Sequence, residues 1–302
     1  RRPILKTDCG ARLNGTPTKG HMAESKLLSS TQVVTIKPAK GWLGIDLQEL
    51  WHYRELIYFL TWRDIKVRYK QAALGLAWAI LQPVLTTLIT SIVFGYLLNV
   101  DTGNLPYPVF TLAALLPWHL FQLSLQKSSI SLVGNANLIT KIYFPRLIIP
   151  LSSVLAVLVD FAISLVILFI AMAIYRMPLS WNALWLVPLT LLTVLAALAV
   201  GLWLSALNVQ YRDIQQMVPF LLQIWMYATP IVYPITLIPE GTIRYLYSLN
   251  PMVGVVQGFR WALFGGAPPD MTLLFSSIAV VVLLVSGLFF FRRMEKTFAD
   301  VV

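Results

Sequence analysis

The sequence predicts an all-α integral membrane protein with about six transmembrane helices per chain. Of its 302 residues, 58% are hydrophobic and only 12% are charged, and the mean hydropathy is +0.73. A soluble domain of this length could not bury so much apolar surface in one core. The apolar residues also gather in stretches long enough to cross a hydrocarbon layer of about 30 Å as helices. Lipid is therefore the main solvent of this chain.

Charge and cysteine content argue against nucleic-acid and metal-binding functions. The formal net charge is +10, but the cations lie mostly beside the ends of the apolar stretches, as membrane topology requires. Cys9 is the only cysteine, so no intrachain disulfide can form. Cys9, His21, His52 and His119 do not have the spacing of zinc ligands. We expect no bound metal and no nucleic-acid partner.

Residues 1–46 are expected to form a polar cytoplasmic tail. Residues 1–19 contain no apolar stretch of the kind found in a secretory signal. Gly20, His21 and Met22 are typical of a cloning junction, so residues 1–21 are either vector-derived or native. Met22 is one candidate for the native start.

Residues 47–71 predict an amphipathic helix that lies on the membrane surface. Leu50, Tyr53, Ile57 and Leu60 recur at helical spacing. The segment carries too many charges to cross the bilayer, and such a helix typically lies in the interface. The cations interleaved with the apolar residues are Arg54, Arg63, Lys66, Arg68 and Lys70.

The remainder, residues 72–302, is expected to form one transmembrane domain. Each apolar stretch except the fifth has about 20 residues or more, enough to span. The predicted spans are 76–98, 107–130, 147–175, 184–209, 217–234 and 271–291.

The cations between these spans predict the orientation. Loops rich in Lys and Arg stay on the cytoplasmic side, which would place both termini there. Three arginines, Arg176, Arg244 and Arg260, are the minority on the outer side. The cations that set the orientation are Arg63, Lys66, Arg68 and Lys70 before the first span, Lys141 and Arg146 after the second, Arg212 after the fourth, and Arg292, Arg293 and Lys296 after the sixth.

The segment 238–269, between the fifth and sixth spans, predicts two short re-entrant helices. Prolines and glycines divide it into two pieces, each too short to cross. Asn250 followed by Pro251 is a strong start signal for the second piece. Re-entrant helices need protein or a wet cavity around their backbone ends. The alternative is an outer loop with amphipathic helices.

The sequence offers little for catalysis. It contains no G-x-x-x-x-G-K-[ST] phosphate-binding loop and no soluble region large enough for a nucleotide-binding domain, so the chain should not hydrolyse ATP by itself. Asp160 is the only acidic residue well inside a predicted span, where an aspartate costs ~2.5 to 3.5 kcal/mol. It either lines a pathway or bonds between helices, or it is a protonated or hydrogen-bonded packing residue.

Aromatic and amide side chains near the predicted boundaries are candidates for a pathway lining. Aromatic rings stack on the C–H faces of sugars, and amides bond their hydroxyls, weakly enough for a chain to slide. The alternative is an aromatic belt that anchors the helices at the interface. The predicted lining residues are Gln82, Trp118, His119, Phe121, Gln122, Asp160, Trp225, Tyr227 and Tyr233.

The cations of the first amphipathic helix are candidates for holding a phosphate or pyrophosphate headgroup. These residues are Arg63, Lys66, Arg68 and Lys70. Simple anchoring by the positive-inside rule is the alternative. Gly254 and Gly258 form a G-x-x-x-G, which permits close helix packing.

Several segments together resemble type-2 ABC exporter permeases for polysaccharides and polyol phosphates. The resemblance covers about residues 47–302. Its motifs are WHYREL at 51–56, TWRDIKVRYK at 61–70, LGLAW at 74–78, LQP at 81–83, IYFPR at 142–146, NVQYRD at 208–213, ATPIVY at 228–233 and NP at 250–251.

The resemblance implies a half-transporter in a bacterial cytoplasmic (inner) membrane. Two copies would form the pore, and two separate ATPase subunits would bind ATP and Mg, so that this chain binds no cofactor. Helix 47–71 would be the gate, and the loop 134–145 would couple to the ATPase. The cargo would be an undecaprenyl-linked polysaccharide such as an O antigen. The coupling residues implied are Asn135, Asn137, Lys141, Tyr143, Phe144 and Pro145.

Other functions stay open at this point. Within export, the cargo could be a teichoic acid, a capsule polymer, or a small drug or lipid. An integral-membrane glycosyltransferase would need carboxylates or histidines clustered at one membrane face, which this sequence lacks. A passive channel would have no dedicated ATPase.

Overall fold

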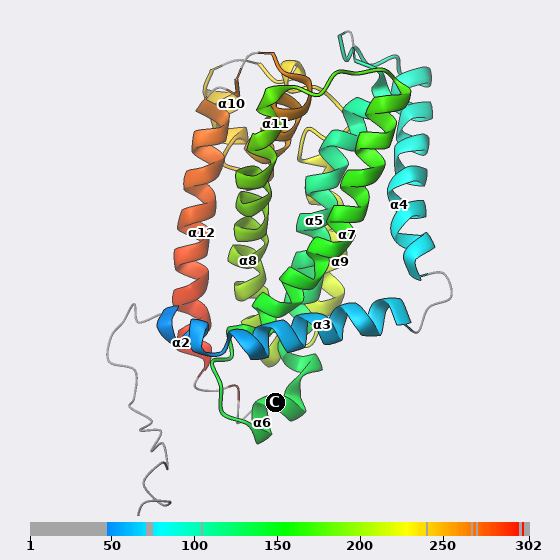
Figure 1. Ribbon diagram of the computed structural model, residues 1–302. Coiled ribbons are helices and arrows are strands. Elements are labelled where there is room, and N and C mark those ends of the chain that lie inside the picture. The colour runs from blue at the N-terminus through cyan, green and yellow to red at the C-terminus, as the bar shows by residue number, and fades with distance from the viewer. Residues whose placement is uncertain are drawn as a thin grey trace, which may run out of the picture. The chain divides into compact units, whose positions relative to one another are not determined.

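The computed structural model describes residues 47–70, 75–103, 105–239, 241–266, 268–269, 271–295 and 298. The predicted tail, with Cys9 and Met22, lies outside these residues. The chain divides into two units, 1–44 and 45–302, and the description concerns the second. Within the described residues all regular secondary structure is helical (Figure 1), as the sequence predicts.

Five helices are long and apolar enough to cross a membrane. The first is α4 (Gly75–Thr90), which continues as the π-helix η1 (Ser91–Leu97), and the fourth joins the 3₁₀ turn η2 (Trp181–Trp185) to α8 (Leu186–Gln210). The others are α5 (Tyr107–Gly134), α7 (Ile148–Ile174) and α12 (Met271–Glu295). These five coincide with five of the six predicted spans.

The fifth predicted span is shorter than expected. Helix α9 (Ile214–Tyr227) has 14 residues, and a helix of that size is only about 21 Å long. Residues 228–234, which were predicted to continue it, are irregular, and the short turn η3 (Ile235–Leu237) follows. Pro230 explains the break, because proline lacks an N–H donor and disfavours the helical conformation of the residue before it.

Helix α5 is the centre of the bundle. It packs against α7 and α8 along most of its length, and nearly all side chains in its N-terminal half are buried. Small residues bring the helices close together: a Cβ on Gly201 of α8 would lie 2.6 Å from Ser128 Oγ of α5. Van der Waals packing of this kind drives helix association in lipid. Asn208 of α8 adds a hydrogen bond of 3.0 Å to the Ser129 carbonyl.

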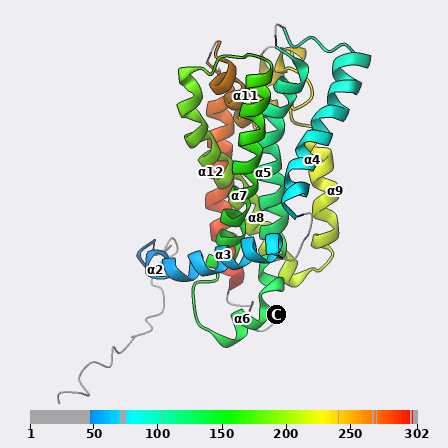
Figure 2. The ribbon, with the colours of Figure 1, turned by 45° about the vertical axis from the view of Figure 1, so that its right-hand side comes forward.

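The predicted amphipathic helix is present, and its position on a membrane surface stays a prediction. It comprises α2 (Leu47–His52) and α3 (Arg54–Lys70), which lie across the end of the bundle where α5 ends and α7 begins (Figures 1 and 2). Leu60 is buried, and its apolar neighbours Tyr53 and Ile57 pack with it against the protein core. The apolar face therefore contacts protein, and the opposite face, with Tyr58 and Trp62, is exposed.

Two helices lie between the fifth and sixth predicted spans, at the opposite end from α3 (Figure 1). They are α10 (Thr242–Tyr247) and α11 (Pro251–Phe264). Asn250 caps α11 by accepting the Met252 N–H at 3.1 Å, with Pro251 at the first helical position, so the predicted start is confirmed.

The G-x-x-x-G of α11 packs closely on its neighbours. A Cβ on Gly254 would lie 2.7 Å from Ser276 Cβ of α12, and one on Gly258 would lie 2.6 Å from Leu189 Cδ2 of α8. Helix α11 is therefore received among the first turns of α8 and α12, as the re-entrant interpretation requires. Its depth in a membrane stays a prediction.

Candidate functional site

Helix α3 is tied to α7 at two places. The Thr61 hydroxyl donates to the Ser152 carbonyl at 3.5 Å. Arg68 forms an ion pair with Asp160, and the Tyr69 hydroxyl donates to the same carboxylate. Burial raises the pKa of Tyr69, so its phenol keeps the proton that it donates. The Arg68 and Asp160 side chains are 27% and 13% exposed, which shields their attraction from water.

The structure places Asp160 in a contact between two helices. The carboxylate bonds two helices, α7 and α3, through a cation and a hydroxyl. A partly buried charge is stable when it is both paired and hydrogen-bonded. The same contact shows that Arg68, predicted as a headgroup ligand, already has a protein partner.

Arg63 is also held by protein. Its guanidinium donates to Asp64 at 2.9 Å and to the Asn135 side chain at 2.9 Å, so it links α3 to the corner that follows α5. Lys66 and Lys70, by contrast, are exposed. Of the predicted headgroup cations, these two lysines therefore offer their charge to a ligand without breaking a described ion pair.

Lys127 is a functional candidate that the sequence analysis missed. It lies on α5 near enough to Arg68 and Asp64 to interact with their charges. A signal was available, because Lys127 is the only charged residue between 107 and 130. The C-terminal half of α5 therefore joins the cationic region around α3.

The predicted lining residues do not form one continuous wall. Trp118 and Phe121 are 0% exposed, and Phe121 packs edge-on against Trp225 with ring centroids 5.1 Å apart. These two rings are core residues, which corrects the lining role predicted for them. The physical reason is that α5, which carries both, is central rather than peripheral.

The other predicted lining residues fall into two groups. Gln82 of α4 and Gln122 of α5 are exposed or partly exposed, and His119 shares the Gln122 face of α5 with its Nε2 buried and without a hydrogen-bond partner among the described residues. Trp225, Tyr227 and Tyr233 instead surround the break after α9. The Tyr233 hydroxyl donates to the Tyr227 carbonyl at 3.0 Å, while Tyr227 is exposed.

The loop predicted to couple to an ATPase protrudes beyond α3. It contains α6 (Ala136–Lys141), and both views show it at the end of the bundle (Figures 1 and 2). Tyr143 is 71% exposed, but Phe144 is only 5% exposed and packs in the same cluster as Leu60. Phe144 is therefore an anchor for the loop, which corrects its predicted contact role.

The remaining predicted coupling residues lie at the loop surface and its corners. Asn137 and Lys141 are exposed, and Asn135 and Pro145 are partly buried. Arg146, directly after the loop, donates to the Glu295 carbonyl at the end of α12. The loop is thus held at both ends by the bundle while its tip is free to meet a partner.

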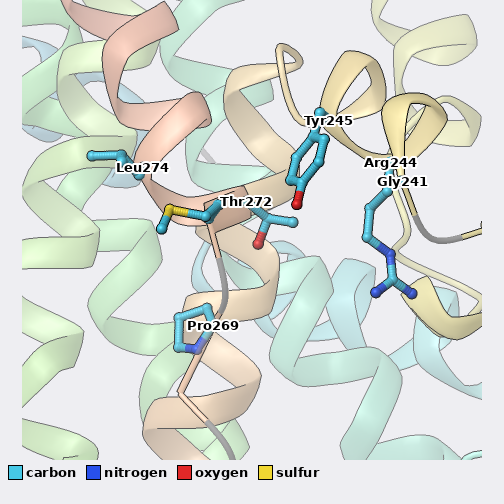
Figure 3. A pocket seen from close by; sticks show the side chains of 7 residues that line it. Gly241, Arg244, Tyr245, Pro269, Thr272 and Leu274 are labelled. Atoms are coloured by element: carbon cyan, nitrogen blue, oxygen red, sulfur yellow. The ribbon is translucent and has the colours of Figure 1, made fainter.

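A pocket of about 630 Å³ lies at the opposite end, between α10 and the start of α12. In Figure 3 the Tyr245 ring and the Thr272 side chain lie toward each other from these two helices. The Arg244 guanidinium donates to the Ile235 and Ile238 carbonyls at 3.4 and 3.3 Å. None of these pocket residues was predicted as a site residue. The pocket is lined by Gly241, Arg244, Tyr245, Pro269, Met271, Thr272 and Leu274.

Comparison with known proteins identifies related membrane proteins. A family model described as ABC-2 type transporter matches residues 55–264, from α3 to the end of α11. The chain is 31% identical over 256 residues to an O-antigen export system permease protein RfbA of Myxococcus xanthus, covering 84% of this chain and 98% of the relative. It is 30% identical over 254 residues to an RfbA of Klebsiella pneumoniae, covering 82% and 95%. It is also 27% identical over 244 residues to the polysialic acid transport protein KpsM of Escherichia coli, covering 78% and 91%.

Proposed function

Because this chain belongs to the ABC-2 type transporter family, we propose that it is the membrane-spanning subunit of an exporter that moves a polysaccharide across a bacterial inner membrane. The observation that carries the proposal is the similarity, over nearly their whole length, to O-antigen export permeases. The multi-pass helical architecture agrees with it. A lipid-linked O-antigen-like polymer is the proposed cargo, and the similarity to KpsM supports a capsule polymer as the second candidate.

The proposal includes a separate motor. Two ATPase subunits, each binding ATP and Mg, would dock on the loop that contains α6, and a second copy of this chain would complete the pathway. The exposed tip at Asn137, Lys141 and Tyr143 supports docking there. The cationic helix ends also support a cytoplasmic orientation of this face, since α3, α6 and the ends of α8 and α12 lie together (Figure 1).

Removal of this chain tests the proposed function. In a strain that encodes it, deletion should leave lipid-linked polymer on the inner face of the membrane, where glycosidase added to spheroplasts cannot digest it. Re-expression should restore digestion, and inactivation of the co-purifying ATPase should abolish it again. Polymer that reaches the outer face unchanged in the deletion strain would refute the function, and its sugar composition would distinguish O antigen from capsule.

The exposed lysines of α3 support a narrower headgroup role. Each lysine near a negative headgroup contributes about 1 kcal/mol, so replacing Lys66 and Lys70 by Gln should weaken binding of undecaprenyl pyrophosphate to the purified chain roughly 30-fold at low salt. Native mass spectrometry in nanodiscs would measure this binding. The matched control is Arg54→Gln, another exposed cation of α3. Equal binding by the double variant and the control would remove the headgroup role.

A further inference from the structure

Most carbonyls of the break after α9 accept hydrogen bonds from side chains, while the Thr229 carbonyl accepts the Ile231 N–H at 2.7 Å. Residues 228–233 form no helix, so their carbonyls need other donors, because unpaired backbone groups are costly where water is scarce. Side chains from α5, α11, the α11 cap and the break itself supply those donors. The hydrogen bonds are Tyr233 Oη to Tyr227 O at 3.0 Å, Asn250 Nδ2 to Ala228 O at 3.0 Å, Arg260 Nη1 to Pro230 O at 2.8 Å, Arg260 Nη2 to Ile231 O at 2.7 Å and Tyr107 Oη to Val232 O at 2.6 Å.

Arg260 of α11 is the central donor. Its side chain is only 7% exposed, and its guanidinium lies 3.6 Å from the centre of the Phe110 ring of α5. Among the described residues no carboxylate forms an ion pair with it. A buried charge is expensive unless its hydrogen bonds are satisfied. The planar fork of arginine can bond two neighbouring carbonyls and stack on a ring at once, which a lysine ammonium cannot do.

A second set of contacts joins the end of α9 to the start of α11. Trp225 Nε1 donates to Asn250 Oδ1 at 2.9 Å, and Asn250 also bonds Thr229 Oγ1 at 3.0 Å. Asn250 therefore caps α11 and holds the last turn of α9 with the same side chain. The remainder of α9 is much less constrained, since only Val218 and Leu222 of its residues are buried.

We propose that Arg260 is a positioning residue for transport. By clamping the Pro230 and Ile231 carbonyls, it makes the end of α9, the break and α11 one rigid unit. A displacement of α9 is then passed to α11. The transport part of this inference rests on the proposed export function. The mechanical part does not, because it depends only on the contacts among α5, α9 and α11.

Distance measurements between spin labels test the clamp. In a Cys9→Ser background, labels at Ile224 in the last turn of α9, which is exposed, and at Phe264 at the end of α11, which is partly exposed, should give one narrow distance distribution in nanodiscs. Arg260→Gln should broaden it at least twofold, and Arg260→Lys should also broaden it. The control is Arg176→Gln, an exposed arginine at the same end of the bundle.

The export assay supplies the second readout. Arg260→Gln should reduce polymer export at least tenfold while Arg176→Gln leaves it unchanged. If Arg260→Gln does not insert, Tyr107→Phe removes one clamping hydrogen bond and keeps the ring, and it should broaden the distribution to a smaller extent. An unchanged distribution in the Arg260 and Tyr107 variants would overturn the clamp, and broadening with normal export would overturn its role in transport. If the unaltered chain exported no polysaccharide, the proposed function would be wrong. The spin-label distances would still show whether Arg260 holds α9 and α11 together.

Discussion

Replacing Asp160 by Asn should loosen α3 from α7. The substitution removes the charge that pairs with Arg68 and weakens the acceptor for Tyr69. Exposed ion pairs are worth up to about 1 kcal/mol, whereas removing one partner of a buried pair costs about 3 to 5 kcal/mol. With side chains 13% and 27% exposed, this pair lies between the two cases. We expect a loss of about 2 kcal/mol, which is roughly a 30-fold change in the opening equilibrium of α3.

Hydrogen exchange of the α3 amides measures that opening. Protection of α3 should fall roughly 30-fold in Asp160→Asn in nanodiscs, while the protection of α8 and α12 stays the same, because local opening reports local contacts. Arg68→Gln should have a similar effect. The double variant should lose about 1 to 2 kcal/mol less than the sum of the single losses, as interacting pairs do.

The matched control is Arg54→Gln, an exposed cation at the start of α3 whose described contacts are local. It should leave protection unchanged. Additive losses in the double variant, or α3 protection that does not respond to Asp160→Asn, would refute the role of the pair as a link between the two helices.

Two further pairs of variants test the close packing of α11 and the anchoring of the loop that contains α6. Gly254→Ala should destabilise the protein by about 1 to 3 kcal/mol through overpacking, since its Cβ would lie 2.8 Å from backbone of α12. Gly258→Ala should lower the stability less, because its added Cβ would meet the flexible end of the Leu189 side chain. Equal thermal stabilities of the two alanine variants in detergent would contradict this order. Phe144→Ala should cost about 3 to 5 kcal/mol as a buried aromatic, whereas Tyr143→Ala should keep stability and reduce the amount of ATPase that co-purifies. Normal thermal stability of the Phe144 variant would show that it does not anchor the loop.

The positively charged side chains have different surroundings at the two ends of the bundle. At the α3 end, Arg63 and Arg68 hold the helix in place and Lys66 and Lys70 remain exposed. At the opposite end, Arg260 satisfies backbone carbonyls within the protein. The arginines that have a described protein partner therefore serve structure, and the exposed lysines are the proposed ligand-binding cations.

Local signals predicted much of the architecture. The five long apolar stretches are the five helices long enough to span, and Asn250 with Pro251 marked the start of α11. Both follow from properties of neighbouring residues: hydropathy summed along a helix, and the capping of a free backbone N–H. The fifth stretch was overextended because its hydropathy is high on both sides of Pro230 while only one side is helical.

The site was less predictable, because contacts between distant residues decide it. Trp118 and Phe121 are of the aromatic type expected in a pathway lining, yet the helices packed around α5 bury them. Periodicity showed that Leu60 belongs to an apolar face, but that face could meet lipid or protein, and the structure shows protein.

The sequence by itself determined that this chain is a helical, multi-pass membrane protein, whereas the structure showed that the fifth predicted span ends at Tyr227. Its motifs also indicated the transporter family. Only the tertiary structure decided that Asp160 pairs with Arg68 and that Arg260 holds the break. Hydropathy and helix capping act over a few residues, whereas an ion pair between residues 92 positions apart depends on how the whole bundle packs.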